Sequence, residues 1–432
     1  MNIIYATDPA SEAAQLRKAT TIIQDSLLDY AKAIMRDVAE HGDPAVLAYT
    51  SKFDGIRLDS LRVTEQEMNQ AYAQVTKDQI MAVKLIKQRL VKCELAILKR
   101  LKGMVLSSSS DGVRIDRMVK PVTSIGCYIP GGRARYPSTV VMCAAPAKVA
   151  GVKRIVALSP PRRDGTVDPL TLVAADICRV DEFYKIGGAQ GIAALTYGTQ
   201  SIRPVSKIVG PGGVFVTAAK LVASAKVSTD MVAGPTELLI YADASVDPHL
   251  VAVDLISQAE HSTDTVCGLV TTSNKIASEV QKRVESIVRK ITRSDIVKKS
   301  LENNGFIVIC RNESSCIEFV NEFAPEHLEI MCKHADAIAR KIDSAGLVLI
   351  GQYAPSSASD YSLGSNHVLP TLGFGKSRAS LSVLDFVKIV NKVKVNKSGL
   401  AKVDRSIKEI TSAEGLLNHY EAVKARMNEK KE

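Results

Sequence analysis

Residues 154–188 read RIVALSPPRRDGTVDPLTLVAADICRVDEFYKIGG, and the fold class follows from this stretch. Two short apolar runs, RIVALS and EFYKIG, have the length and composition of buried strands. The segment PLTLVAADICRV between them suits a helix, and a second helical segment, AQGIAALTYG, follows the glycine turn Gly187–Gly188. Strand–helix alternation in units of about 25–30 residues indicates a parallel sheet with helices on both faces.

The same alternation extends in both directions from this stretch. Residues 113–132 read as short strands ending in a Pro-Gly-Gly turn, and a helix follows from about residue 138. Downstream, the strand KIVG meets the turn Pro211–Gly213, and further strands are expected at ELLIYAD, CGLVTTS, GFIVIC and AGLVLIG. Helices are expected between these strands. This count fits two incomplete, Rossmann-like α/β domains that meet near residue 237.

The two ends of the chain depart from this alternation. Apolar residues at three-and-four spacing predict helices over residues 11–41, and a capping box at Thr64–Glu67 begins a helical block that reaches about residue 101. We therefore expect the following units: an N-terminal segment, 1–20; a first α/β domain with a helical layer, 21–127 and 238–380; a second α/β domain, 128–237; and a small C-terminal extension, 381–432.

Composition narrows the class of protein. With 46% hydrophobic and 24% charged residues among 432, the chain reads as a globular protein, and no apolar run is long enough to span a membrane. The N-terminus lacks a secretory signal pattern, so we expect a cytoplasmic protein. Eight scattered cysteines without a C-x-x-C pair speak against disulfides or a cysteine zinc site. The net charge of +10 is spread along the chain, and the absence of tryptophan speaks against nucleic-acid binding.

The segment Ala324-Pro325-Glu326-His327 places a carboxylate beside an imidazole, directly after a proline. Pro325 suits the first position of a helix, so we expect Glu326 and His327 in a first helical turn. A Glu/His pair of this kind can transfer protons at neutral pH. A plain helix start with an acidic N-terminal residue explains the same pattern, and the segment alone does not separate the two readings.

Besides His327, three histidines lie in polar stretches punctuated by glycine or proline. His261 shares a helix face with Gln258, while His367 and Asp360 fall in one loop and His419 lies near the C-terminus. A set of Gln, His, Asp and His would suit a zinc ion with an open position for substrate. Spacing makes Glu260 as good a ligand as Gln258, and it does not show that these residues converge. The remaining histidines, at 41, 249 and 334, carry no assigned role.

Eight motifs occur in the order and spacing of histidinol dehydrogenases, which the chain resembles over nearly its whole length. The motifs are YIPGG, GGAQ, GPGG, AGPTE, SQAEH, APEH, DY-x-x-G-x-NHVLPT and EGL-x-x-H. The resemblance implies oxidation of L-histidinol to L-histidine through L-histidinal, at the end of histidine biosynthesis. It further implies two successive hydride transfers to NAD, one zinc ion per subunit that holds the substrate, and a homodimer in which the C-terminal extension crosses to the partner.

Carried over motif by motif, the resemblance assigns roles to individual residues. Glu326 and His327 become the catalytic proton-transfer pair in the first α/β domain. The zinc ligands are Gln258, His261, Asp360 and His419, which favours Gln258 over Glu260. Substrate contacts are implied for Thr236, Gln258, His261, His327, Asp360, His367, Glu414 and His419. Cofactor contacts are implied in the second α/β domain for Tyr128, Gln190 and Gly213.

The chain departs from the family pattern at four positions. Gly213 stands where the family has an asparagine that would contact NAD, and Thr236 replaces a serine. Ser356 and Ser359 replace the usual glutamate and glycine near Asp360. Two other functions therefore stay open: a dehydrogenase of the same family acting on another alcohol, and a non-catalytic homologue with a basic binding surface. A rival chemistry through a cysteine nucleophile would use Cys127 or Cys267.

Overall fold

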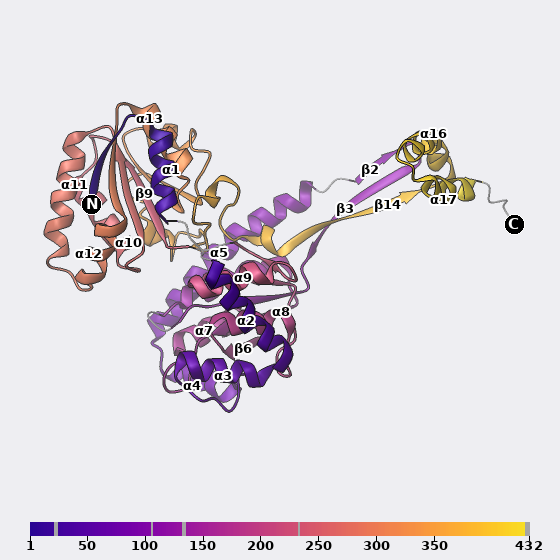
Figure 1. Cartoon of the computed structure of the whole chain (residues 1–432), viewed down its shortest axis with the longest axis horizontal. Coiled ribbons are helices and arrows are strands. Elements are labelled where there is room, and N and C mark those ends of the chain that lie inside the picture. The colour runs from indigo at the N-terminus through magenta and orange to yellow at the C-terminus, as the bar shows by residue number, and fades with distance from the viewer. Residues whose placement is uncertain (21–24, 105–106, 132–134, 232–233, 428–432) are drawn as a thin grey trace.

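A computed structural model of the protein describes residues 1–20, 25–104, 107–131, 135–231 and 234–427. These residues form two α/β bodies and an arm that projects away from both (Figure 1). Each body is built on a parallel sheet, and the arm is built on an antiparallel one. The α/β fold class with Rossmann-like parallel sheets, predicted from the strand–helix alternation, is confirmed.

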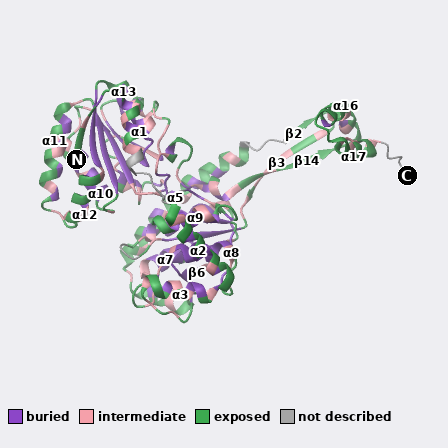
Figure 2. Cartoon of the chain, in the orientation of Figure 1, coloured by how far each residue is buried: buried purple, intermediate pink, exposed green. Residues whose placement is uncertain are grey.

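The first body contains a six-stranded parallel sheet with the order β1-β11-β10-β9-β12-β13. Its strands are β1 (Asn2–Ala6), β9 (Glu237–Ala242), β10 (Val266–Thr271), β11 (Gly305–Cys310), β12 (His327–Met331) and β13 (Leu347–Ile350). Its helices are α1 (Pro9–Thr20), α10 (Pro248–Ala259), α11 (Asn274–Val288), α12 (Ser294–Asn304), α13 (Glu313–Phe323), α14 (Ala335–Ala339) and α15 (Ser356–Ser359). Separate clusters of buried apolar side chains cover the two faces of the sheet, so its inner strands are buried throughout (Figure 2).

The second body contains a five-stranded parallel sheet with the order β6-β5-β4-β7-β8. Its strands are β4 (Ser124–Tyr128), β5 (Arg154–Ser159), β6 (Glu182–Lys185), β7 (Lys207–Val209) and β8 (Ser228–Thr229). The helices α6 (Pro137–Ala150), α7 (Pro169–Ile177), α8 (Gly188–Tyr197) and α9 (Val214–Ala223) connect these strands. In both sheets the strand order reverses at one point, between β4 and β7 here and between β9 and β12 in the first body.

The N-terminal helices α2 (Asp25–His41), α3 (Asp43–Asp54), α4 (Glu65–Ala73) and α5 (Lys77–Met104) pack on the second body. Apolar residues of α2 and α3 join the core that α8 and α9 form on one face of its sheet, and those of α4 and α5 join α6 and α7 on the other. The expected grouping of residues 21–127 with 238–380 therefore differs from the observed packing. The apolar stripe of an amphipathic helix does not specify which of two similar sheets it covers. Residues 1–20, expected as a separate segment, pack on the first body through β1 and α1.

The arm joins two segments that are far apart in the chain. Strand β3 (Val113–Pro121) pairs with β14 (Val387–Val395) over its full length, and β2 (Ser107–Ser110) lies on the other side of β3. Two short 3-10 turns, Phe374–Lys376 and Val383–Phe386, precede β14. The C-terminal helices α16 (Lys397–Ala413) and α17 (Leu417–Met427) pack on each other at the tip of the arm (Figure 1). The expected C-terminal extension is thus a β-ribbon that ends in a helical hairpin.

Candidate active site

A cavity of about 280 Å³ lies between the two bodies, at the point where the strand order of each sheet reverses. From the second body it is lined by the turns after β4 and β7, which contribute Pro130 and Gly213. These are carboxyl ends of strands, where open α/β sheets bind ligands. From the first body it is lined by residues just before β9 and at the start of β12, which are amino ends. The second body therefore contributes the carboxyl ends of its strands to the cavity, whereas the first body contributes the amino ends of its strands.

Most of the residues implied by the family motifs meet in this cavity. Its lining includes Gly213, Thr236, Gln258, His261, Glu326, His327, Asp360 and His367. These side chains come from separate segments of the chain, so spacing in the sequence could not show that they converge. The lining also includes Ser138 and Thr139 at the start of α6, which the sequence did not single out. The signal available for them was a polar pair that opens an otherwise apolar helix.

The local structure of the APEH segment differs from the expected helix start. Helix α13 ends at Phe323, and Ala324 adopts the left-handed conformation with φ of 49° as the cap of that helix. Pro325 follows the cap, a common position for proline because it cannot continue a helix. His327 then begins β12, whose buried run HLEIM pairs with β9 and β13. The prediction that Glu326 and His327 lie in a first helical turn is wrong, because the apolar run that follows is a central strand.

His327 is buried and held at both ring nitrogens. Its Nδ1 lies 3.2 Å from the backbone carbonyl of Glu237, which only a protonated nitrogen can satisfy. Its Nε2 lies 3.2 Å from Oδ1 of Asp360, and Oε2 of Glu326 lies 3.7 Å from Nδ1. Burial alone would lower the pKa of His327, but the carboxylates of Glu326 and Asp360 raise it well above its usual value. The imidazole is therefore oriented by two carboxylates and one carbonyl.

The carboxylate of Glu326 is buried beside this imidazole. Its Oε2 accepts a hydrogen bond of 2.7 Å from the backbone N–H of Glu237. Burial raises the pKa of Glu326, and the neighbouring His327 offsets this rise only in part. A carboxylate with a raised pKa is a better proton acceptor at neutral pH than one in water. A buried carboxylate beside an imidazole suits acid–base chemistry, and the catalytic role of the pair stays a prediction.

Three of the four implied zinc ligands share the cavity. Gln258 and His261 lie at the end of α10, and Asp360 follows α15 directly. Among the described residues no group of three or more His, Cys, Asp and Glu side chains is placed to hold a metal ion. The set in the cavity consists of one carboxamide, one imidazole and one carboxylate. It therefore contains only two side chains of those four types.

The chemistry of these three side chains fits a divalent cation. The carboxamide of Gln258 is buried, and its Nε2 has no hydrogen-bond partner. Because the oxygen and nitrogen of a carboxamide can exchange places, the amide can present its oxygen to a cation instead. Burial lowers the pKa of His261, which favours the neutral, ligating imidazole. Oxygen and imidazole donors of this kind are ligands that zinc accepts.

His367 bridges the two bodies at the rim of the same cavity. Its Nδ1 donates to the backbone carbonyl of Asp360 at 2.7 Å, and its Nε2 lies 3.2 Å from the hydroxyl of Thr139. Burial lowers the pKa of His367, in keeping with a neutral imidazole that donates at one nitrogen and accepts at the other. This side chain therefore connects the Asp360 loop of the first body to α6 of the second.

The remaining implied residues lie elsewhere. Glu414 and His419 are exposed on the arm, which extends away from the cavity (Figure 1). Tyr128 is buried at the end of β4, and its hydroxyl accepts from the N–H of Gly188 at 3.1 Å. Gln190 is buried in α8 with neither side-chain atom hydrogen-bonded. Tyr128 and Gln190 thus lie in the second body without lining the cavity.

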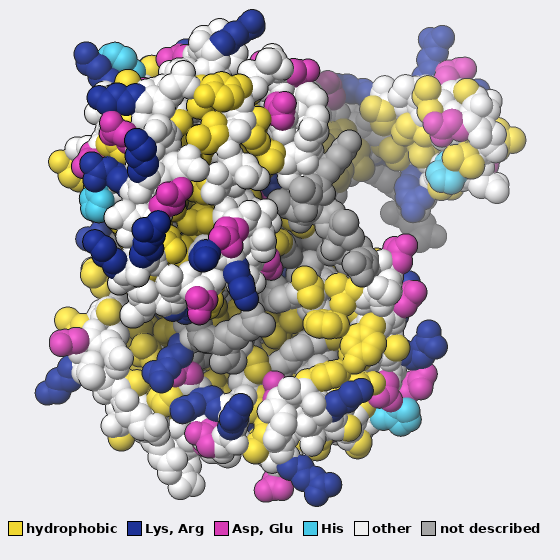
Figure 3. All heavy atoms as spheres, turned by 60° about the vertical axis from the view of Figure 1, so that its left-hand side comes forward, with side chains coloured by type: hydrophobic (Ala, Val, Ile, Leu, Met, Phe, Trp, Pro, Cys, Tyr) yellow, Lys and Arg dark blue, Asp and Glu magenta, His cyan; other side chains and the backbone are white. Residues whose placement is uncertain are grey.

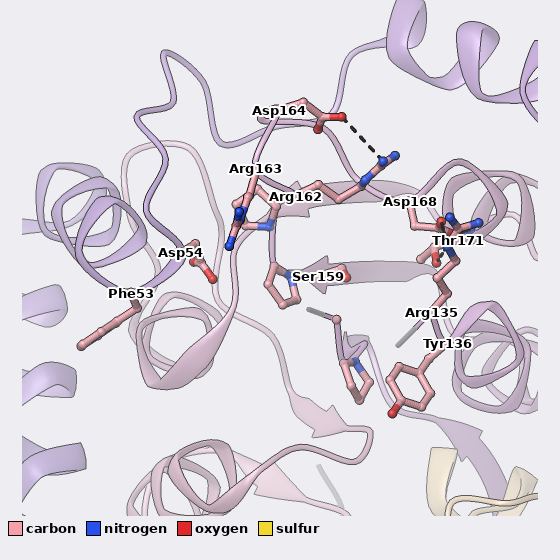
Figure 4. A pocket seen from close by; sticks show the side chains of 14 residues that line it. Phe53, Asp54, Arg135, Tyr136, Ser159, Arg162, Arg163, Asp164, Asp168 and Thr171 are labelled. Carbon is pink, nitrogen blue, oxygen red and sulfur yellow. Dashed lines mark hydrogen bonds and ion pairs between the residues drawn. The ribbon is translucent and has the colours of Figure 1, made fainter. Parts of the chain in front are cut away.

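A second cavity of about 710 Å³ adjoins the first and shares Pro130 and Tyr136 with it. Among the described residues, three arginines line it: Arg135, Arg162 and Arg163 (Figure 4). Asp54 also lines it; burial raises the pKa of this carboxyl to about 6, and its Oδ2 has no hydrogen-bond partner. The sequence signal for this site was the polar run PPRRD directly after the strand RIVALS, where a parallel strand ends.

The two cysteines considered as nucleophiles are buried inside strands. Cys127 lies in β4 and Cys267 in β10, both with no exposed surface, and neither lines the cavity. Burial raises the pKa of the Cys267 thiol, which disfavours the reactive thiolate. The geometry therefore does not favour thiohemiacetal chemistry.

Two Rossmann-like bodies that enclose a cavity with a buried Glu/His pair define a two-domain α/β enzyme of the dehydrogenase type. No helix within the described parts of the chain has the length and apolar character needed to cross a bilayer. Comparison with known proteins narrows the class. The family model for histidinol dehydrogenase matches residues 17–427, and the chain belongs to that family.

Relatives from distant organisms support this membership over the whole length. Histidinol dehydrogenase of Methanocaldococcus jannaschii is 40% identical over 93% of each chain. That of Bacillus cereus is also 40% identical and covers both chains completely. The crystal structure of histidinol dehydrogenase from Elizabethkingia anophelis has a TM-score of 0.92, with 34% identity, over 99% of this chain and 98% of that one.

Proposed function

We propose that the protein oxidises L-histidinol to L-histidine with NAD as the hydride acceptor, as the final step of histidine biosynthesis. Family membership over residues 17–427 carries this function. The cavity supports it, because a buried Glu/His pair lies beside a set of oxygen and nitrogen donors at the junction of the two bodies.

The adjacent acid–base groups suit two successive oxidations. The first oxidation needs His327 as the neutral imidazole, which requires that Asp360 release Nε2. His327 then takes the proton of the alcohol while hydride leaves to one NAD. In the second, Glu326 takes a proton from water as the water oxygen adds to the aldehyde carbon, and His327 returns its proton to the carbonyl oxygen, which gives the hydrate and leaves His327 neutral again. His327 then takes a proton from the hydrate as hydride leaves to a second NAD. Both groups lie in one cavity, so the aldehyde need not leave between the steps.

We propose zinc as the metal, held by Gln258, His261 and Asp360 of one chain and His419 of a second. Zinc would supply a fixed positive centre for the imidazole and amino nitrogens of the substrate. The buried Nε2 of Gln258, which has no hydrogen-bond partner, supports this assignment. The fourth position is proposed for a partner chain because His419 belongs to α17, which lies at the tip of the projecting arm. Glu414, on the same arm, would then contact substrate in the partner's cavity.

NAD is proposed to occupy both cavities. They are contiguous through Pro130 and Tyr136, so an extended dinucleotide can place its nicotinamide beside His327 and its remaining length in the second cavity. The three arginines there would face its pyrophosphate, since guanidinium groups bind phosphate strongly. Gly213 lines the first cavity, and the unpartnered carboxamide of Gln190 lies in the same body.

A non-catalytic role with a basic binding surface finds less support. On the face shown in Figure 3, Lys and Arg side chains are interspersed with Asp and Glu. A continuous basic patch would instead be expected for a surface that binds polyanions.

The deciding experiment measures NADH formed from L-histidinol, with and without a chelator that removes zinc. We expect two NADH for each histidinol consumed, and loss of turnover after chelation that added zinc restores. Turnover of a different alcohol in preference to histidinol would favour a related dehydrogenase. No turnover of any alcohol by zinc-loaded protein would contradict the proposal.

A further inference from the structure

Glu237, the first residue of β9, makes a reciprocal contact with the catalytic carboxylate. The backbone N–H of Glu237 donates to Oε2 of Glu326 at 2.7 Å, and the backbone N–H of Glu326 donates to Oε2 of Glu237 at 3.2 Å. Each residue thus binds the main chain of the other through its side chain. The backbone carbonyl of Glu237 also accepts from Nδ1 of His327. One residue therefore contacts both members of the proton-transfer pair.

Arg17 of α1 clamps the side chain of Glu237 from the other side. Its guanidinium forms a two-pronged ion pair with both carboxylate oxygens of Glu237, which is 1% exposed. The N–H of Leu372 donates to the same carboxylate at 2.9 Å. A buried carboxylate without such partners would be costly, so the two-pronged contact with the arginine offsets that cost and fixes the Glu237 side chain in place.

The same guanidinium holds the turn that leads into the catalytic residues. It donates to the carbonyl of Phe323 at 2.5 Å and to that of Ala324 at 3.4 Å, and it stacks on the Phe323 ring at 3.9 Å. Ala324 has a left-handed backbone conformation, which is unfavourable for alanine and needs support from its surroundings. Arg17 thus fixes both the cap before Pro325 and the carboxylate that binds the N–H of Glu326.

We propose that Glu237, clamped by Arg17, is a positioning residue that aims Glu326 at its water in the second oxidation. This role rests on the proposed function. The side chain of Glu237 binds Glu326, whereas its main-chain carbonyl binds His327. Replacing the side chain therefore disturbs the water-activating group and leaves the His327 contact in place. Loss of positioning should fall more heavily on aldehyde oxidation than on alcohol oxidation.

The first test replaces Glu237 with Gln and measures each half-reaction per folded molecule. Oxidation of L-histidinal should lose about 10- to 100-fold in kcat, with KM within about threefold of the wild-type value, because misaimed groups slow the step more than they weaken binding. The first hydride transfer from L-histidinol should change much less. Equal losses in both half-reactions, or no loss, would overturn the positioning role. A wild type that does not oxidise histidinol would overturn the proposed function and this role with it.

The second test replaces Arg17 with Ala and adds guanidinium ion at millimolar concentration. The free cation should restore part of the lost kcat by occupying the vacated position beside Glu237. Arg154 offers a matched control, because it forms a two-pronged pair with Glu182 and donates to two backbone carbonyls in the second body. Arg154→Ala should gain no activity from guanidinium. Equal gains in both variants, or none in Arg17→Ala, would overturn the clamp. If Arg17→Ala fails to fold, the half-reaction rates of Glu237→Gln decide whether Glu237 is a positioning residue.

Discussion

Nε2 of His327 lies 3.2 Å from Oδ1 of Asp360. This contact connects the first residue of β12 with the residue that directly follows α15. Burial would raise the pKa of Asp360, but its hydrogen bond to His327 and the nearby charge lower it overall. Asp360 is also a proposed metal ligand. The proposed proton-transfer group, His327, and the proposed metal site therefore share the carboxylate of Asp360, and a change in either should affect the other.

Glu326→Gln should separate the two oxidations. The carboxamide oxygen of glutamine can still accept from the N–H of Glu237, but the side chain can no longer take a proton from water. We expect the oxidation of L-histidinal to fall by about 10²- to 10⁴-fold, the usual range for losing a general base. The first hydride transfer, followed as a burst of NADH, should be affected far less. Equal loss in both steps would refute a role of Glu326 in water activation.

His261→Asn should remove bound zinc. His261 lines the cavity beside Gln258, and asparagine is too short to replace the imidazole in the same position. Metal analysis of the purified variant should find less zinc per chain than in the wild type. His249→Asn is the control, because His249 is exposed on α10 away from the cavity. Unchanged zinc content in His261→Asn would exclude the ligand assignment.

Gly213→Asn should lower the KM for NAD with little change in kcat. Gly213 is the cap residue before α9, with φ of −67°, and a Cβ there would meet no atom within 4 Å. Asparagine therefore fits without strain, and its side chain would project from a residue that lines the cavity. Gly103→Asn is a suitable control, because a Cβ at Gly103 also meets nothing and the site lies on α5. A KM for NAD that rises or stays unchanged in Gly213→Asn would contradict the prediction.

The elements that sequence analysis predicted well are those specified by local pattern. The strands RIVALS and EFYK, and the helix that follows each of them, appear where the sequence pattern put them, as β5, α7, β6 and α8. Strand β12 was missed because HLEIM follows a proline and is too short for periodicity to separate strand from helix. Pairing of β3 with β14 joins segments more than 260 residues apart, and no local signal encodes such a contact.

The candidate site shows the same difference between features that a local sequence pattern specifies and contacts between distant segments. Motifs supplied the residue types, and the cavity brings Gln258, His261, Asp360 and His327 together. The contribution of Arg17 was not visible in the sequence, because it acts on Glu237 across 220 positions of the chain. A residue that acts through another's side chain leaves no spacing pattern. Only the packing of α1 against α13 brings it within reach.

Glu94→Gln should remove one component of the pH dependence of stability. Glu94 of α5 is 3% exposed, and burial raises the pKa of its carboxyl from 4.5 to about 6 while the N–H of Val383 donates to it at 2.6 Å. Between these two pH values the folded protein binds more protons than the unfolded chain, so the Glu94 contribution to stability falls as pH rises through this window. Glutamine does not ionise and can still accept from Val383.

The expected result is a gain in stability of Glu94→Gln relative to wild type as pH rises from 4.5 to about 6, with no further change above that. Thermal unfolding of both proteins across this range measures the difference, in which the other titrating groups cancel. A difference that is constant with pH, or that shrinks as pH rises, would contradict a raised pKa for this carboxyl.

Co-expression of two inactive variants should test whether the arm completes a partner's site. His261 lies in the cavity and His419 lies on the arm, so the proposed metal set needs both from different chains. In a hybrid dimer of His261→Asn and His419→Asn with exchanged arms, one site carries both changes and the other carries neither. Random pairing makes half of the dimers hybrid, so activity should return to about a quarter of the wild-type value. If each chain supplied its own His419, every site would carry one change, and the mixture would stay as inactive as its components.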